Sequence, residues 1–273
     1  MDIDTIEPHP LVHAKTVARE AGAILLSGFC HVRQLEFKGS IDLVTEYDKE
    51  SEKHIVQYLQ KTYPEHNILT EECGAIYNNP NCDFEWIIDP LDGTSNFVHG
   101  YPVFAVSIAL AYLGNIIISV IYDPVRGEMF SAQVGKSSTL NGNITRVSNT
   151  QALEFSMLAT GFPYDIRTNK QNNLDHFSHM ILRCQEIRRS GSASLDLAWT
   201  SCGRLDGFWE IGLQPWDIAA GSLLVQEAGG RVTDHTGGNQ WLELGNILAS
   251  NRFIHGEILA VLSKGEHAPF PER

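Results

Sequence analysis

Residues 86–97 read WIIDPLDGTSNF, and this stretch decides the fold. Its three leading apolar residues predict the end of a short buried strand. Pro90 has no N–H to donate to a central strand, so we expect the chain to leave the sheet at Asp89. Gly93 then permits a tight turn, and the three polar residues that follow it are types preferred at a helix N-terminus.

This arrangement places Asp89 and Asp92 at the carboxyl end of a strand, beside the N–H groups of a helix start. Carboxylates in such a place can hold hard cations, and the N–H groups can hold phosphate. An Asp-Pro turn with a solvated acid is the simpler interpretation of Asp89 and Pro90 taken alone. That interpretation leaves the rest of the string unexplained, so we favour a binding site.

Composition limits the class of protein. The chain has 273 residues, 43% of them hydrophobic, which suits one large domain or two closely packed lobes. It has no apolar run long enough to cross a membrane, and its N-terminus lacks the basic and apolar regions of a secretory signal. Five scattered cysteines without a CxxC pair favour free thiols over a zinc cluster. Together these features predict a cytoplasmic protein.

The formal net charge of −13 argues against general nucleic-acid binding, which needs a basic face. It also bears on any phosphate-containing substrate, because clustered carboxylates repel phosphate. Divalent cations must then mediate binding, since the charge of the ion reverses the local electrostatics. We therefore expect an acid-lined site to depend on divalent cations.

Hydrophobic spacing, turn residues and capping types predict alternating helices and strands. In the first half we expect a helix at 9–29, an extended piece at 42–45, a helix ending before Pro64, a strand at 67–70, an exposed loop at 74–83, strands at 103–112, 116–122 and 129–132, and turns at 113–115 and 141–142. In the second half we expect a strand at 153–160, helices at 172–183, 195–202 and 217–228, strands at 207–211, 231–234 and 247–249, and a closing helix at 254–262. Two lobes, residues 1–142 and 143–273, are expected to form one compact catalytic unit.

Three further acids are candidates for the same site, although each has a simpler explanation. Asp48 is expected in the first turn of a helix, where the helix dipole alone favours an acid. Glu71 follows a short strand together with Glu72, and adjacent acids are usually solvated. Asp217 is expected at a helix N-terminus, where a capping aspartate is common. With the two acids of the central stretch, they are hard oxygen ligands suited to magnesium rather than zinc.

The ordered motifs of the chain resemble the inositol monophosphatase family. They are DPLDGTSNF at 89–97, TEE at 70–72, DLVT-x-x-D at 42–48, GSAS at 191–194 and WDIAAG at 216–221. The resemblance extends from about residue 11 to residue 263. It implies an α+β fold, a layered αβαβα sandwich of the sugar-phosphatase type, and a homodimer. It also implies hydrolysis of phosphate monoesters that requires two or three Mg²⁺ ions per site and is inhibited by lithium.

The resemblance implies metal-binding roles for individual residues. Glu71, Asp89 and the carbonyl of Leu91 match the ligands of one metal ion. Asp89, Asp92 and Asp217 match the ligands of a second ion, so Asp89 would bridge the two. A third, more weakly held ion lies near Glu71 in the family, largely through water.

Catalytic and substrate-binding roles are implied in the same way. Asp48 and Thr94, with Glu71, match residues that orient and help deprotonate the attacking water. The N–H groups of Gly93 and Thr94 match the phosphate-binding groups, and the role of Lys38 is left open. Glu210 matches the acid that hydrogen-bonds the hydroxyls of inositol. The substrate-binding residues implied are Asp92, Ser192, Ala193, Glu210 and Asp217.

Alternative functions exist within and beyond this reaction. Related phosphatases hydrolyse fructose 1,6-bisphosphate, histidinol phosphate, phosphoadenosine phosphate or NADP, but the nucleotide branch tends to have a lysine after DGT, which this chain lacks. Some bacterial relatives also bind transcription or RNA-processing machinery, and Arg183, Arg188 and Arg189 are candidates for a local basic patch. Dimer contacts or plain surface are simpler explanations of these arginines. An inactive scaffold is disfavoured by the intact set of acids.

Overall fold

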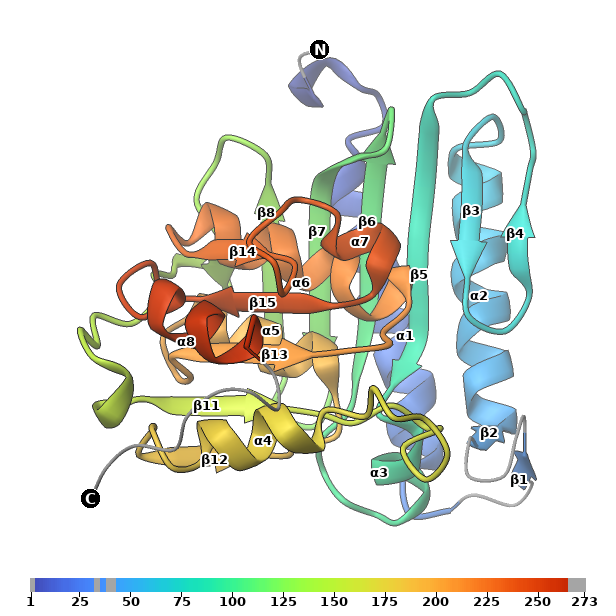
Figure 1. Ribbon diagram of the computed structural model, residues 1–273. Coiled ribbons are helices and arrows are strands. Elements are labelled where there is room, and N and C mark those ends of the chain that lie inside the picture. The colour runs from blue at the N-terminus through green and yellow to red at the C-terminus, as the bar shows by residue number, and fades with distance from the viewer. Residues whose placement is uncertain (1–2, 32–34, 38–42, 265–273) are drawn as a thin grey trace.

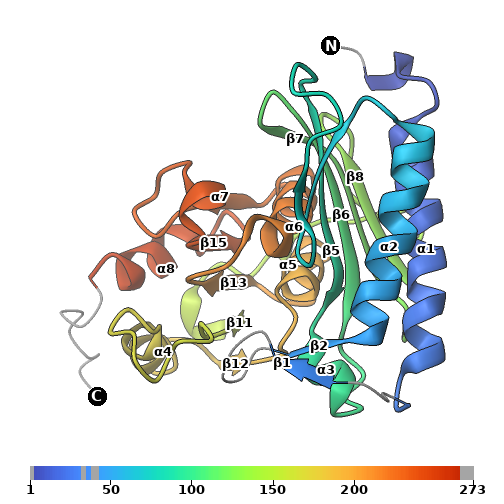
Figure 2. The same cartoon turned by 90° about the vertical axis from the view of Figure 1, so that its right-hand side faces the viewer.

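The computed structural model describes residues 3–31, 35–37 and 43–264 of the chain (Figure 1). Its helices and sheets form five layers in the order helix, sheet, helix, sheet, helix, which confirms the predicted αβαβα sandwich (Figure 2). The turn expected at 38–40, which includes Lys38, lies outside the described residues, as does Asp42.

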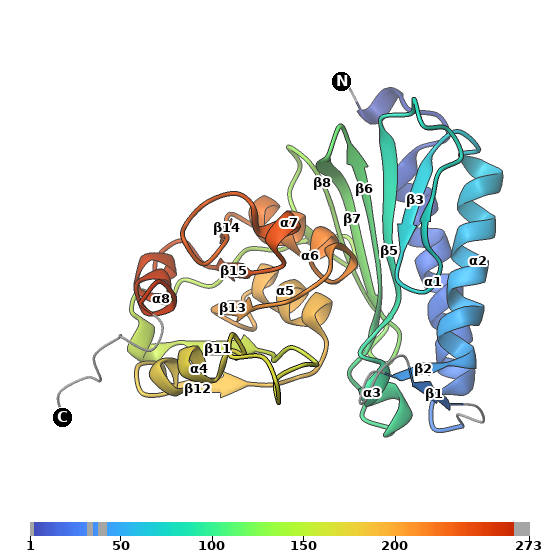
Figure 3. The same ribbon diagram turned by 45° about the vertical axis from the view of Figure 1, so that its right-hand side comes forward.

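The helices belong to three of these layers (Figure 3). α1 (Pro10–Gly28) and α2 (Glu46–Thr62) cover the outer face of the large sheet, α5 (Ala193–Ser201) and α6 (Pro215–Glu227) lie between the two sheets, and α4 (Leu174–Met180) and α8 (His255–Leu262) cover the far face of the small sheet. The shorter helical elements are α3 (Thr94–Val98), α7 (Trp241–Leu244), η1 (Ile3–Thr5) and η2 (Leu153–Phe155).

The large sheet has eight strands in the order β10-β9-β8-β7-β6-β5-β3-β4. Their bounds are β3 (Asn67–Thr70), β4 (Gly74–Ile76), β5 (Phe84–Asp92), β6 (Ala105–Tyr112), β7 (Asn115–Asp123), β8 (Glu128–Gln133), β9 (Thr139–Leu140) and β10 (Asn143–Ile144). β5 is parallel to β3 and antiparallel to β6. A separate antiparallel pair is formed by β1 (Leu35–Phe37) and β2 (Leu43–Thr45).

The small sheet has five strands in the order β12-β11-β13-β15-β14. Their bounds are β11 (Met157–Thr160), β12 (Glu186–Arg188), β13 (Gly207–Glu210), β14 (Arg231–Thr233) and β15 (Ile247–Ser250). β11 is parallel to both β12 and β13, whereas β15 is antiparallel to β13 and β14. The acid-bearing ends of β5 and β13 therefore belong to different sheets.

The side-chain pattern of the large sheet explains why helices cover both of its faces. Trp86 and Ile88 pack with α1 and α2, whereas Ile87 packs with α5 and α6, as the alternation of a strand requires. β6 presents mainly alanines to the middle helices, and small side chains let α6 approach closely. Ser119 Oγ donates a hydrogen bond of 2.5 Å to the carbonyl of Ala220 on that helix. Close packing thus places α6 firmly against the sheet.

The structure corrects the expected exit of the chain from the sheet at Asp89. Strand β5 continues through Pro90 to Asp92, but its pairing with β6 is irregular between Asp89 and Asp92. On the other side, the pairing with β3 ends at Ile88. Neither neighbouring strand, β3 or β6, needs an N–H from Pro90. The proline therefore marks an irregularity of β5 rather than its end.

Some other elements differ from expectation. Residues 74–76 of the expected loop form β4, because they pair with the edge of β3. The strand expected at 153–160 begins as a 3-10 turn, and only its second half pairs. The helix expected at 172–183 is limited to α4. β12 and α7 are absent from the prediction because such short elements carry almost no periodicity.

The remaining expected elements are confirmed, with ends that differ by a few residues. All five cysteines are unpaired, as predicted. No helix in the described part of the chain is long and apolar enough to cross a membrane. The large sheet ends at Ile144 and the small sheet begins at Met157, near the expected boundary at residue 142. The division into two lobes stays a prediction.

Candidate active site

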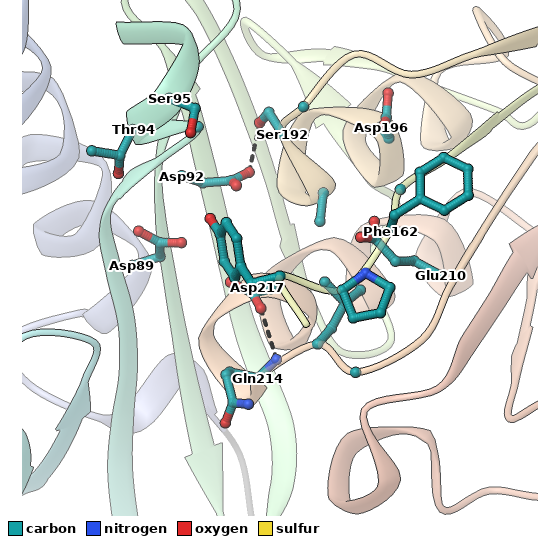
Figure 4. Close-up of a pocket in the computed structure, with 18 of the residues that line it drawn as sticks. Asp89, Asp92, Thr94, Ser95, Phe162, Ser192, Asp196, Glu210, Gln214 and Asp217 are labelled. Atoms are coloured by element: carbon teal, nitrogen blue, oxygen red, sulfur yellow. Dashed lines mark hydrogen bonds between the residues drawn. The ribbon is translucent and has the colours of Figure 1, made fainter. Parts of the chain in front are cut away.

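A pocket of about 330 Å³ lies where the carboxyl end of β5 meets the N-termini of α3, α5 and α6 (Figure 4). Every residue that the sequence predicts for the site lines this pocket, except Asp48. The lining residues among them are Glu71, Asp89, Leu91, Asp92, Gly93, Thr94, Ser192, Ala193, Glu210 and Asp217. The tertiary structure therefore brings residues from both halves of the chain around one cavity.

Asp89 is held by the irregular end of β5. It is 2% exposed, and its Oδ1 accepts a hydrogen bond of 3.0 Å from the N–H of Leu91. This local turn fixes the carboxylate at the strand end and leaves Oδ2 outside that hydrogen bond. The carbonyl oxygen of Leu91 lies 3.1 Å from Thr94 Oγ1, at the start of α3. A side-chain oxygen and a backbone oxygen are thus presented by one short segment.

Asp92 is held by the N-terminus of α5. Its Oδ2 accepts hydrogen bonds from Ser192 Oγ at 2.5 Å, from the Ser194 N–H at 2.8 Å and from the Ser194 hydroxyl. The partial positive charge of a helix N-terminus favours an ionised acid there. Asn96 Nδ2 adds a second connection by donating to the carbonyl of Ser190 at 2.9 Å. These contacts join the two halves of the chain inside the site.

Two acids of the site are also capping residues. Asp217 is the third residue of α6, and its Oδ2 accepts a hydrogen bond of 2.7 Å from the N–H of Gln214. Asp48 is the third residue of α2, and its Oδ2 accepts one of 2.8 Å from the N–H of Thr45. Such capping boxes satisfy backbone donors at helix starts. A carboxylate has a second oxygen, so capping and participation in the site are compatible.

Asp48 contacts the lining of the pocket through Thr94. Asp48 is fully buried, and its Oδ1 accepts a hydrogen bond of 2.9 Å from Thr94 Oγ1. Burial raises the pKa of Asp48, and the hydrogen bonds from Thr45 and Thr94 oppose that rise. Thr94 lines the pocket, so its hydroxyl lies between the cavity and a buried proton acceptor.

The acids of the pocket repel one another. Burial is the main reason why the pKa values of Asp89, Asp92 and Asp217 are raised. The negative charges of Glu71, Asp92 and Asp217 raise the pKa of Asp89 further, while the serine hydrogen bonds oppose the rise at Asp92. Without a cation, these carboxyl groups retain protons to higher pH than ordinary acids do. Binding of a divalent cation would therefore release protons.

The donor chemistry of the pocket suits a hard cation. Its acids and the carbonyl of Leu91 present oxygen, and no histidine or cysteine is among its described lining residues. Within residues 3–31, 35–37 and 43–264, no three His, Cys, Asp or Glu side chains form a complete metal cluster by themselves. Mg²⁺ does not require such a cage, because it usually binds one or two carboxylates and keeps several waters. The residues therefore fit Mg²⁺ that is held partly through water and substrate phosphate.

The turn between β5 and α3 requires glycine. Gly93 has φ of 96° and ψ of 36°, in the left-handed region, and a Cβ there would lie 2.9 Å from the carbonyl oxygen of Val103. Gly93, Thr94 and Ser95 all line the pocket. The first N–H groups of a helix have no acceptor within the helix, so this turn offers donors to an anion.

Glu210, at the end of β13, lies on the opposite side of the pocket with Asp196 and Phe162 (Figure 4). Burial raises the pKa of Glu210 to about 8, and the positive charge of Arg189 opposes this rise. Its carboxylate lies directly over Gly161, where a Cβ would overlap it. The absence of a side chain at Gly161 therefore makes room for Glu210.

Several residues that shape the pocket were missed by sequence reasoning. Ser194 lies in the motif GSAS, but nothing local shows that it bonds to Asp92. Gly161 and the buried Asp196 carry no sequence signal of a site, since their partners come from distant segments. Thr45 could have been found, because Thr45 and Asp48 have the spacing of a capping box.

The layered αβαβα sandwich and its acid-lined pocket agree with the fold class and the kind of site that the resemblance implies. Comparison with known proteins gives the family. The model of the inositol monophosphatase family matches residues 8–267. The Nus factor SuhB of Escherichia coli (strain K12) is 44% identical over 255 residues, which cover 92% of this chain and 95% of that protein.

Solved structures agree with this result. The extragenic suppressor protein suhB from Bartonella henselae is 40% identical with a TM-score of 0.87, covering 93% of this chain and 98% of that one. The inositol monophosphatase from Anabaena (Nostoc) sp. PCC 7120 is 41% identical with a TM-score of 0.86, covering 93% and 95%. The chain belongs to the inositol monophosphatase family.

Proposed function

We propose that this protein hydrolyses phosphate monoesters in a magnesium-dependent reaction, and that its substrate is inositol 1-phosphate or a related polyol or sugar phosphate. The observation that carries the proposal is the convergence of Glu71, Asp89, Asp92 and Asp217 with the N-terminus of α3 in one pocket. Acids alone would repel a phosphate, so cations must lie between them and the substrate. Family membership supports the reaction class, and the name of the Anabaena protein supports the substrate class.

Magnesium would be held by oxygen atoms on the β5 side of the pocket. Glu71, Asp89 and the Leu91 carbonyl are the proposed ligands of one ion, and Asp89, Asp92 and Asp217 those of a second. A third ion is proposed near Glu71, held largely through water. When bound, such ions neutralise phosphate charge and lower the pKa of a coordinated water.

Thr94 and Asp48 would handle the proton of the attacking water. As the water oxygen bonds to phosphorus, its proton passes to Thr94 Oγ1, and the proton of that hydroxyl passes to Asp48 Oδ1, 2.9 Å away. Burial raises the pKa of Asp48, which makes it a better proton acceptor than an ordinary aspartate. The bond from phosphorus to the ester oxygen breaks, and that oxygen takes a proton from solvent. Glu71 would help to orient the water.

The two remaining parts of the substrate would be bound by separate groups. The N–H groups of Gly93 and Thr94 would hold the phosphate, as a helix N-terminus does. Glu210 would accept hydrogen bonds from hydroxyls of the leaving alcohol, and Ser192 and Ala193 would form the adjoining wall. This division predicts that phosphate binding is common to all substrates, whereas Glu210 selects among alcohols.

A panel of substrates tests the proposed function. The protein is assayed with Mg²⁺ on inositol 1-phosphate, fructose 1,6-bisphosphate, histidinol phosphate, phosphoadenosine phosphate and NADP, with and without lithium. We expect the highest kcat/KM for inositol 1-phosphate, no turnover without Mg²⁺, and inhibition by lithium. A preference for the 3′-phosphonucleotide would overturn the polyol assignment, and no hydrolysis of any ester would overturn the enzyme assignment.

A binding role in transcription is the second candidate, and the name Nus factor SuhB of the E. coli relative favours it. Two of the arginines considered for this role have contacts within the chain. Arg188 pairs with Glu186 at 2.8 Å, and Arg189 lines the pocket. Co-purification with the Asp89→Asn variant tests the role, because a partner that is retained by this variant would bind independently of catalysis. Recovery of no specific partner would count against it.

A homodimer is also proposed, on the family resemblance alone. Light scattering after size-exclusion chromatography measures the mass directly. A mass of one chain across a range of concentrations would contradict the dimer.

A further inference from the structure

Glu52 is a buried acid of α2 that the reaction proposed above does not use. It is 2% exposed, and its Oε2 accepts hydrogen bonds from the hydroxyl of Thr70 and, at 2.9 Å, from the N–H of Glu72. These two donors lie immediately before and after Glu71: Thr70 is the last residue of β3, and Glu72 lies in the turn that leads to β4. One carboxylate oxygen therefore accepts hydrogen bonds from both residues that flank a proposed metal ligand.

The same side of α2 contacts two further segments of the site. Asp48, Ser51 and Glu52 have the spacing of residues that share one helix face. Asp48 accepts the hydrogen bond from Thr94, and Ser51 Oγ donates one of 2.9 Å to the carbonyl of Pro90. The turn after β3, the end of β5 and the start of α3 are thus all attached to one helix. α2 is therefore the element that sets their relative positions.

We propose that Glu52 is a positioning residue for Glu71 and thereby sets the affinity of the site for the divalent cation that Glu71 would hold. This inference rests on the proposed function, because it requires Glu71 to be a metal ligand. An apolar side chain could fill the same space without the cost of burying a carboxylate. The two hydrogen bonds from the neighbours of Glu71 therefore explain the presence of a carboxylate at position 52 better than packing does.

A purely structural connection between α2 and β3 is the competing explanation. It predicts that loss of the Glu52 carboxylate lowers folding stability and leaves the affinity for cations unchanged. The positioning role predicts weaker cation binding by a protein that is still folded. Partners that orient metal ligands commonly change metal affinity about 10- to 100-fold, so the two explanations are separable.

Calorimetric titration of the substrate-free full chain with Mg²⁺, repeated with Mn²⁺, tests the proposal. In Glu52→Ala we expect the affinity for one ion to fall at least about tenfold. Glu52→Gln should retain most of the affinity, because its carbonyl oxygen can accept the same two hydrogen bonds. Val56→Ala, one turn further along α2, is the matched control: it removes buried side-chain volume from the same helix and should leave the affinity unchanged.

Unchanged cation affinity in a folded Glu52→Ala protein would overturn the proposal. Thr70→Val tests the same contact if Glu52→Ala does not fold, since it removes one donor and keeps the shape of the side chain. In the Glu52→Ala background, Thr70→Val should reduce the cation affinity little further, because both substitutions break the same contact. If the two substitutions had fully additive effects on the cation affinity, Glu52 and Thr70 would not act through one shared contact.

Glu71→Gln separates failure of this inference from failure of the proposed function. If Glu71→Gln leaves cation binding unchanged, the assignment of Glu71 as a ligand is wrong. If Glu71→Gln weakens binding and Glu52→Ala does not, the ligand assignment stands and only the positioning role is wrong.

Discussion

The two ends of the pocket are built in different ways. At the acid end, two carboxylates are fixed by backbone N–H groups nearby in the chain, Asp89 by Leu91 and Asp217 by Gln214. A third, Asp92, is instead held by the distant Ser192 and Ser194. At the opposite end, the carboxylate of Glu210 lies over Gly161, which belongs to a distant segment. Short local motifs therefore place Asp89 and Asp217, whereas long-range packing alone shapes the space proposed for the leaving alcohol.

A buried polar network supports this second end. Asn173 Nδ2 donates to the carbonyl of Gly161 at 2.6 Å, and Asn173 Oδ1 accepts a hydrogen bond of 2.9 Å from Trp209 Nε1. Thr160 Oγ1 donates to the carbonyl of Trp209 at 2.7 Å. Because Trp209 directly precedes Glu210, the network holds both strands that form this end. We therefore expect substitutions at the acid end to change turnover, and substitutions here to change substrate preference.

Asp89→Asn should have the largest effect, because it weakens the proposed shared ligand of two ions. We expect kcat to fall more than about 100-fold, equivalent to roughly 2.7 kcal/mol of barrier. Steady-state assays with saturating Mg²⁺ measure this loss, and Asp83→Asn, at an exposed acid away from the pocket, is the matched control. A kcat within about tenfold of the unsubstituted protein, or ~1.4 kcal/mol, would refute the bridging role of Asp89.

Thr94→Ala should have the next largest effect, because it removes the hydroxyl between the pocket and Asp48. General-base assistance is typically worth about 10²- to 10⁴-fold, so we expect kcat to fall within this range. Thr94→Ser, which keeps the hydroxyl, should retain most of the activity. Titration with Mg²⁺ should show similar cation affinity in both variants. Equal kcat values for the alanine and serine variants would exclude the proton relay.

Glu210→Gln should change selectivity more than turnover. We expect kcat/KM for inositol 1-phosphate, relative to that for p-nitrophenyl phosphate, to fall by up to about tenfold, because one lost hydrogen bond between neutral groups costs roughly 0.5–1.5 kcal/mol. Cation affinity should be unchanged. A large loss of cation affinity would instead assign Glu210 to the acid end, and the contrast between the two ends would disappear.

The pH dependence of folding stability tests the protonation of Glu210. Burial raises the pKa of Glu210 from 4.5 to about 8, so without a cation the native state binds more protons than the unfolded state across this interval. Stability of the cation-free protein should therefore fall as pH rises from 4.5 to about 8. Urea unfolding in the presence of a chelator measures how the free energy of unfolding changes with pH. Glu210→Gln should reduce this slope. The same slope in both proteins would show that Glu210 does not titrate as described.

The sequence by itself determined the acid-bearing motifs and most of the regular elements. Strand alternation and helix periodicity predict the individual elements, because each element buries one or both of its faces. The layered arrangement of these elements was implied by the family resemblance. The acids at the pocket could be recognised because they stand in ordered motifs that resemble a known family. Three of them also belong to local structure that closes within a few residues: a turn at 89–91 and capping boxes at 45–48 and 214–217. Gly93 belongs to the same group, since its turn depends on backbone conformation at one position.

Only the tertiary structure decided which of these local units meet. Pro90 could lie inside a strand because the pairing with β3 stops at Ile88, which no pattern in residues 86–97 reveals. The roles of Glu52 and Gly161 depend on partners elsewhere in the chain. Glu52 contacts the residues around Glu71, and Gly161 lies under the carboxylate of Glu210. The physical reason is that the packing of two sheets around α5 and α6 fixes these distances, and local sequence carries no record of it.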